Sequence, residues 1–284
     1  MVTLWNGLLL RIAKHWIAGE TYEEAISRAE RSNTHKVHGI INLLGEDITN
    51  PEQTTAAATE YAQILKTISE RRIHCSISIK PTQLGIGIDE GLFTTNLESI
   101  LTTATQLDNS VWVDMESSSY TAKTVDLYLD FRRRFENIGV AIQAYGRRSE
   151  EDLNRVLDAK GSVRLCKGAY NENTQTVYKN RKEIRNNFSK LMLRLFERGR
   201  GFAIATHDEK LIHEAIELSR THHTDFEFEM LMGIRDQKKI ELAEQGYRVA
   251  EYIPYGKSWK AYSVRRITEH KSNILLLGRS LLSN

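Results

Sequence analysis

Short runs of hydrophobic and β-branched residues alternate with longer segments of helical character along most of the chain. Eight of these runs are typical of strands, at residues 37–44, 74–80, 111–116, 140–145, 162–167, 202–206, 226–231 and 248–252. Nearly all of them are followed by a helical stretch, which is the pattern of a (β/α)8 TIM-like barrel. An open doubly wound sheet is the alternative, although no GxGxxG sequence follows the first strand.

Helix-start signals support the connections between these strands. Thr21 and Glu24 form a capping box, and Asn50 stands as a cap before Pro51 in the first turn of the next helix. One connection is ambiguous, because the apolar residues within 125–131 alternate more like a strand than like a helix.

Composition favours one large domain. The chain has 284 residues, 40% of them hydrophobic, with three prolines and no low-complexity stretch, so we expect a single barrel domain over residues 1–284. A net charge of +2 gives no reason to expect a nucleic-acid partner. Cys75 and Cys166 do not make a disulfide framework, which suits a cytoplasmic protein. Residues 5–12 are too short for a transmembrane segment or a signal peptide, and we expect a helical lead-in there.

The last predicted helix carries four residues at helical spacing i, i+3, i+4 and i+7, and Ser258 can cap its start. These four are Tyr262, Arg265, Arg266 and Glu269. Paired guanidinium groups can bind a small carboxylate through two parallel hydrogen bonds. The alternative is an ordinary solvated basic face.

Polar residues recur where the predicted strands end. They are Lys80, Asp114, Glu116, Gln143, Arg164, Lys167, Thr206, His207 and Tyr252. In a barrel these side chains would converge on one mouth, where such enzymes have their active sites. Taken singly, each could be a structural ion-pair partner or a loop residue.

Three functional classes remain open at this point. The first is a site for a ligand that carries a phosphate or a ring, because the glycine in Lys167-Gly168 allows such a group to approach the backbone closely. The same glycine could equally end a strand. Either Lys80 or Lys167 could serve as the Schiff-base nucleophile of a lyase or aldolase. A non-enzymatic, carboxylate-binding barrel is the third class.

Several motifs resemble, in the same order, those of one enzyme family. They are at residues 79–85 (Ile-Lys-Pro-Thr-Gln-Leu-Gly), 164–170 (Arg-Leu-Cys-Lys-Gly-Ala-Tyr), 205–207 (Ala-Thr-His), 226–231 (Phe-Glu-Phe-Glu-Met-Leu), 252–256 (Tyr-Ile-Pro-Tyr-Gly) and 262–266 (Tyr-Ser-Val-Arg-Arg). Together they resemble FAD-dependent proline dehydrogenases of the monofunctional type. The resemblance implies a distorted (β/α)8 barrel that binds FAD at its C-terminal mouth, with a final helix closing that mouth.

The resemblance also implies roles for individual residues. Substrate-binding roles fall to Lys80, Tyr170, Leu231, Tyr252, Tyr262, Arg265 and Arg266, with the two arginines on the carboxylate and Glu269 holding them. Cofactor-binding roles fall to Met115, Gln143, Arg164, Lys167, Gly168, Ala169, Thr206 and His207. Asp114, in a network with Lys80, and Arg164, near flavin N5, would be catalytic.

The implied reaction is oxidation of L-proline to Δ1-pyrroline-5-carboxylate, with hydride transfer from C5 to FAD N5, as the first step of proline catabolism. A quinone-type electron acceptor, peripheral contact with the inner face of the membrane, and coupling to a separate pyrroline-5-carboxylate dehydrogenase follow from the family. The chain departs from the usual pattern at Cys166, Asn173 and Met232, which leaves open whether proline or 4-hydroxyproline is preferred.

Overall fold

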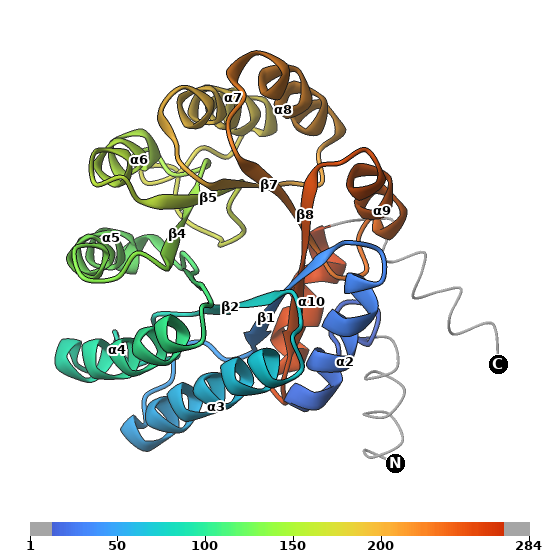
Figure 1. The fold of residues 1–284 in the computed structure, drawn as a ribbon. Helices are drawn as coiled ribbons and strands as arrows, with labels where there is room; N and C mark the ends of the chain where they lie inside the picture. The colour runs from blue at the N-terminus through green and yellow to red at the C-terminus, as the bar shows by residue number, and fades with distance from the viewer. Residues whose placement is uncertain (1–12, 270–284) are drawn as a thin grey trace.

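The computed structural model describes residues 13–269, which form a closed barrel of parallel strands with helices around it (Figure 1). The strands are β1 (His38–Leu43), β2 (Cys75–Ile79), β3 (Val111–Val113), β4 (Ile138–Gln143), β5 (Ser162–Cys166), β6 (Phe202–Ala205), β7 (Phe226–Leu231) and β8 (Arg248–Tyr255). Closure comes from β1 pairing with β8 in parallel. The barrel prediction is confirmed, and the open doubly wound alternative is wrong.

Helices alternate with the strands as the sequence pattern predicts. They are α2 (Tyr22–Asn33), α3 (Pro51–Glu70), α4 (Glu90–Gln106), α5 (Ser118–Arg132), α6 (Ser149–Asp158), α7 (Arg181–Arg198), α8 (Glu209–His222), α9 (Asp236–Glu244) and α10 (Trp259–Glu269). The capping box of Thr21 and Glu24 is present, and Asn50 caps α3. The expected lead-in helix at residues 5–12 lies outside the described residues.

One ambiguous segment is resolved by the structure, and one predicted strand boundary needs correction. The alternating segment 125–131 is part of helix α5, whose buried residues Val125, Tyr128 and Phe131 follow one another at helical spacing of three. Strand β8 continues beyond Tyr252 because β1 runs alongside it as far as Tyr255. Neighbouring strands, rather than local sequence, therefore set these element boundaries.

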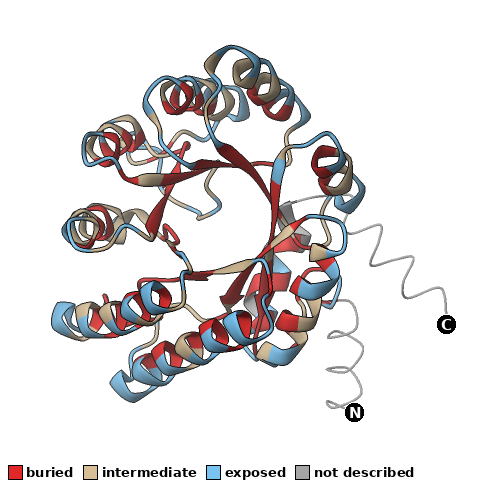
Figure 2. Cartoon of the chain, viewed as in Figure 1, coloured by how far each residue is buried: buried red, intermediate tan, exposed pale blue. Residues whose placement is uncertain are grey.

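The main hydrophobic core lies between the outer face of the barrel and the helices, whose buried residues face the strands (Figure 2). A second, smaller cluster joins the segment before α2 to the last helix, and its members include Trp16, Ile17, Trp259 and Tyr262. Trp259 also donates a hydrogen bond of 2.9 Å to Glu20. Within residues 13–269, no helix is both long enough and apolar enough to cross a membrane.

Candidate active site

A buried carboxylate, Asp114, is the centre of a polar network inside the barrel. It follows β3 and accepts hydrogen bonds from side chains of three other strands or their ends. The donors are the Ser78 hydroxyl at 2.7 Å, Lys80 Nζ at 3.1 Å, Arg164 Nη1 at 2.9 Å and the Tyr252 hydroxyl at 2.6 Å. Only closure of the barrel brings these residues together, because they come from β2, β3, β5 and β8.

The charges in this network support one another. Burial alone would raise the pKa of Asp114, but the nearby cations Lys80 and Arg164 outweigh it and hold that pKa below its usual value. Burial would likewise lower the pKa of Lys80, but Asp114 raises it well above the ordinary value. Burial and the adjacent carboxylate both raise the pKa of Tyr252. The network therefore holds a carboxylate, an ammonium and a neutral phenol.

Arg164 lies deeper in the barrel and is 4% exposed. Its guanidinium stacks on the Trp112 ring, 4.6 Å from the centroid, and lies 5.6 Å from the Tyr252 centroid. Its Nε forms an ion pair with Glu229 of β7. Sequence reasoning assigned no role to Ser78, Trp112 or Glu229. For Glu229 a signal was present, because it stands two residues before Leu231 and so shares a strand face with it.

Lys80 also connects to the loop after β1. Its Nζ lies 3.6 Å from Glu46, and Glu46 accepts a hydrogen bond of 3.2 Å from the Tyr170 hydroxyl. Glu116, another predicted strand-end carboxylate, accepts hydrogen bonds from the backbone N–H and the hydroxyl of Thr82 at 2.7 and 2.6 Å. Burial raises the pKa of Glu116, and the charge of Lys80 opposes that rise.

A second group of predicted residues lies at the ends of β5 and β6. Lys167 Nζ is 2.6 Å from Asp208, and Arg185 of α7 binds the same carboxylate at 2.9 Å. Thr206 accepts a 3.1 Å hydrogen bond from the Asp208 backbone, and His207 Nε2 accepts one of 3.0 Å from the Leu231 backbone. These contacts place two cations beside the predicted cofactor residues, and Arg185 was missed because it lies within a helix.

Gly168, between Lys167 and Ala169, occupies a backbone conformation that other residues rarely adopt, with φ of +99°. A Cβ atom there would lie 2.3 Å from the Tyr145 ring. Both the backbone conformation and the neighbouring ring therefore require glycine at this position. An ordinary strand-ending turn would impose only the first of these requirements.

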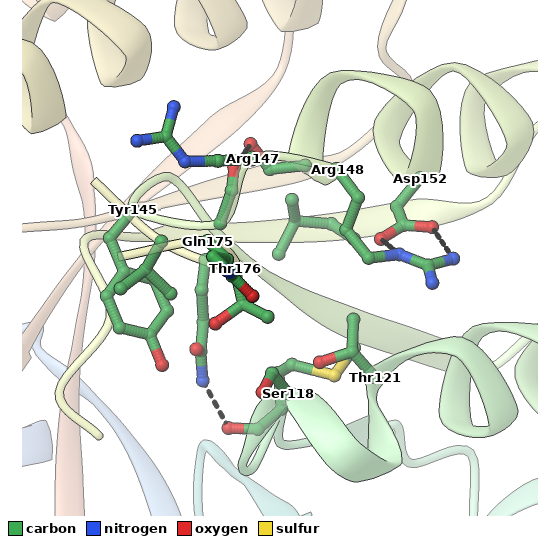
Figure 3. A pocket seen from close by; sticks show the side chains of 14 residues that line it. Ser118, Thr121, Tyr145, Arg147, Arg148, Asp152, Gln175 and Thr176 are labelled. Atoms are coloured by element: carbon green, nitrogen blue, oxygen red, sulfur yellow. Dashed lines mark hydrogen bonds and ion pairs between the residues drawn. The ribbon is translucent and has the colours of Figure 1, made fainter. Parts of the chain in front are cut away.

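A cavity of about 300 Å³ opens beside two further predicted residues, Met115 and Gln143 (Figure 3). Gln143 Nε2 donates a 2.6 Å hydrogen bond to the Met115 carbonyl. Arg148 and Asp152 line the cavity, and Arg148 Nε lies 2.7 Å from the Asp152 carboxylate. The loop at residues 175–177 also lines the cavity, and it has no periodic pattern that could have indicated it.

The last helix begins at Trp259, directly after the predicted cap Ser258. Tyr262 and Arg266 are buried, and the Arg266 guanidinium lies 5.2 Å from the Tyr262 ring centroid. The side chains of Arg265 and Glu269 lie outside the described part of the structure. One arginine of the predicted clamp is thus buried with an aromatic partner at the C-terminal end of the barrel.

Comparisons with known proteins agree with this arrangement. A sequence profile for proline dehydrogenase matches residues 25–276. Proline dehydrogenase 1 of Bacillus subtilis is 34% identical over 273 residues, which cover 95% of this chain and 90% of the relative. Proline dehydrogenase of Deinococcus radiodurans is 31% identical over 287 residues, covering 98% of this chain and 91% of the relative.

Among solved structures, proline utilization A from Bdellovibrio bacteriovorus, inactivated by N-propargylglycine, has the same fold with a TM-score of 0.85 and 22% identity. The match covers 91% of this chain but 32% of that larger protein. The profile and the relatives span nearly all of the chain. The chain therefore belongs to the proline dehydrogenase family.

Proposed function

We propose that this protein oxidises L-proline to Δ1-pyrroline-5-carboxylate with FAD as its cofactor, in a single barrel domain over residues 1–284. The observation that carries the proposal is the network of Lys80, Arg164 and Tyr252 around Asp114, in a chain of this family. These groups combine fixed positive charge with a hydroxyl at the end of a barrel where substrates enter.

The substrate would be held by its carboxylate. Arg266, with Arg265 beside it in sequence, would bind the carboxylate as a bidentate clamp, and Lys80 would add a nearby positive charge. The walls around the ring would come from Tyr170, Leu231, Tyr252 and Tyr262. Burial of Arg266 supports this role, because a desolvated guanidinium binds an anion more strongly than an exposed one.

The residues present fit FAD. Arg164 Nη2 is a buried donor with no hydrogen-bond partner among the side chains that the structure describes, so it can serve a ligand group. Gly168 lets the chain after β5 turn closely against the Tyr145 ring, and the Lys167 and Arg185 cations near this turn suit a diphosphate. Met115, Gln143, Ala169, Thr206 and His207 would complete the contacts.

The chain's own residues would orient the substrate and control its proton. When bound, FAD would supply the oxidising chemistry, as the acceptor of the hydride that leaves proline C5. The fixed charges of Lys80 and Arg164 would lower the pKa of the bound proline amine, since like charges disfavour an ammonium group. The neutral amine is the form that releases hydride from C5.

The electron acceptor and the product's fate are also part of the proposal. A quinone-type acceptor would reoxidise the cofactor, which would bring the protein to the membrane surface as a peripheral protein. A separate pyrroline-5-carboxylate dehydrogenase would consume the product.

Turnover with a trapped product tests the proposal. We expect the FAD-loaded protein to reduce a quinone or dye only when L-proline is present, and to yield a product that condenses with o-aminobenzaldehyde. The same sample can be treated with borohydride and carbonyl substrates, which would trap a Schiff base at Lys80 or Lys167. Trapping without proline turnover would favour the lyase alternative, although the Asp114 ion pair keeps Lys80 protonated and poorly nucleophilic.

A further inference from the structure

The interior of the barrel contains an acidic side chain with an incomplete set of partners, Glu229. It is 3% exposed and lies on β7, where its Oε2 pairs with Arg164 Nε. Its other oxygen, Oε1, is buried without a hydrogen-bond partner among the described residues, as is Arg164 Nη2. A buried ionised carboxylate normally satisfies both oxygens, so this arrangement suits a carboxyl group that can also hold a proton.

Charged neighbours surround this pair on several elements. The ionisable groups around it are Asp114 after β3, Arg164 in β5, Glu227 in β7 and Tyr252 in β8. On β6 the residue paired with Glu229 is Ala205, which has no charge. Asp114 has two cations, Arg164 at 2.9 Å and Lys80 at 3.1 Å, whereas Glu229 shares only the first of them.

We propose that Glu229 is a positioning residue that holds the Arg164 guanidinium through Nε and, by gaining or losing a proton, sets the net charge beneath the flavin. The inference rests on the proposed function, because it takes the barrel mouth as the flavin site. The cations Lys80 and Arg164 lie among three carboxylates, those of Glu46, Asp114 and Glu229. Protonation of Glu229 makes the site more positive by one unit of charge, which favours the more electron-rich, reduced cofactor.

The titration of Glu229 agrees with this geometry. Burial raises the pKa of Glu229 to about 7, with Arg164 opposing the rise and the carboxylate of Glu227 adding to it. Both protonation states are then populated at neutral pH. Positive charge at the mouth would accordingly change across the neutral pH range.

Glu229→Gln is the central variant, because it keeps the shape and fixes the neutral state. Glu227→Gln is the matched control, since Glu227 lies two residues earlier on the same strand and pairs with His38 at 3.1 Å. In FAD-free protein, thermal unfolding should be measured from about pH 5 to 8. The raised folded pKa means that wild-type stability falls as pH rises from 4.5 through about 7. Glu229→Gln should lack this fall, whereas Glu227→Gln should keep it with its midpoint moved to lower pH, because the Glu227 carboxylate helps to raise the pKa of Glu229.

The reduction potential of bound FAD over the same pH range is the second readout. We expect the reduction potentials of wild type and Glu229→Gln to agree at low pH. As pH rises, the potential of the variant should lie increasingly above that of wild type. Parallel curves for the two proteins, or the same effect in Glu227→Gln, would overturn the proposal.

Two further measurements test the proposal even if Glu229→Gln fails to fold. Glu229→Asp keeps the charge but is too short to hold Nε, so we expect retained pH dependence with weaker FAD binding. In wild-type protein, a labelled Glu229 carboxyl that titrates at its ordinary value in NMR would also overturn the proposal. Failure of the proposed function would give a different result. L-proline would then fail to reduce the FAD-loaded protein, in wild type and in the Glu229 variants alike.

Discussion

The Tyr252 hydroxyl donates a 2.6 Å hydrogen bond to Asp114 although the two residues are 138 positions apart in the chain. The bond crosses from β8 to the end of β3, so it exists only when the barrel is closed. Because it joins a predicted wall of the substrate site to the central carboxylate, it connects the fold directly to the proposed chemistry.

Tyr252→Phe should remove this bond and little else. Hydrogen bonds to charged groups contribute about 1.5–3 kcal/mol, so we expect stability to fall within that range. We also expect kcat/KM for L-proline to fall by roughly tenfold or more, because about 1.4 kcal/mol corresponds to a factor of ten. Urea unfolding and steady-state kinetics measure the two effects, and an unchanged kcat/KM would contradict the role of Tyr252 at the substrate.

Asp114→Asn should leave the buried cations Lys80 and Arg164 without their shared counter-charge. Removing one partner of a buried ion pair costs about 3–5 kcal/mol. The pH dependence gives a sharper test. Because the folded pKa of Asp114 is depressed, its stabilisation is present above its ordinary pKa of 3.8 and is lost as pH falls through the folded value. Wild type and the variant should therefore converge in stability under strong acid and differ at neutral pH.

Arg266→Lys should weaken binding of the proline carboxylate. Lysine keeps the charge but cannot form the bidentate pair, so we expect KM for L-proline to rise by about tenfold or more. Lys257→Ala, at an exposed position just before α10, is the control and should leave KM unchanged. Equal KM values for wild type and Arg266→Lys would argue against the carboxylate clamp.

Gly168→Ala should destabilise the loop that follows β5. The left-handed conformation costs a non-glycine residue about 1–2 kcal/mol, and the added Cβ would also meet the Tyr145 ring at 2.3 Å. Gly201→Ala separates the two effects, because Gly201 has φ of +60° and nothing within 4 Å of its Cβ position. We expect a larger drop in melting temperature at Gly168, together with weaker FAD binding. Equal drops would show that the Tyr145 contact has no effect.

The rate of flavin reduction should rise with pH through the ionisation of the proline amine. The reason is that the neutral amine releases hydride and the ammonium does not. Stopped-flow reduction with saturating L-proline at a series of pH values measures this. A rate that does not change with pH would remove the neutral amine from the mechanism.

The fold was largely predictable from periodicity, because each barrel strand is buried and bounded by turn residues. Asp114, Lys80 and Tyr252 were predictable as residues near strand ends. Their pairing was not, because it depends on closure between distant strands. The sequence around Glu229 indicates only which side chains share a strand face, whereas its pairing with Arg164 depends on the curvature of the whole barrel.

Outside the strands, prediction from sequence was weaker. The segment 125–131 was ambiguous because its apolar residues cover more than one side of the helix. Glu116 was predictable as a carboxylate at a strand end, but its hydrogen bond from the Thr82 backbone N–H was not. The cavity beside Gln143 depends on a loop at residues 175–177, and loop positions follow from tertiary contacts such as Gly146 with Val177.

Absorption spectroscopy during anaerobic titration with L-proline tests the central claim most directly. The FAD-loaded protein should show flavin absorption bands at about 380 and 450 nm, which come from the cofactor's own chemistry. We predict that L-proline bleaches the band at the longer wavelength and that a quinone restores it. Flavin bands that remain unchanged at saturating L-proline would contradict the account, because the cofactor would then be bound in a site that does not oxidise proline.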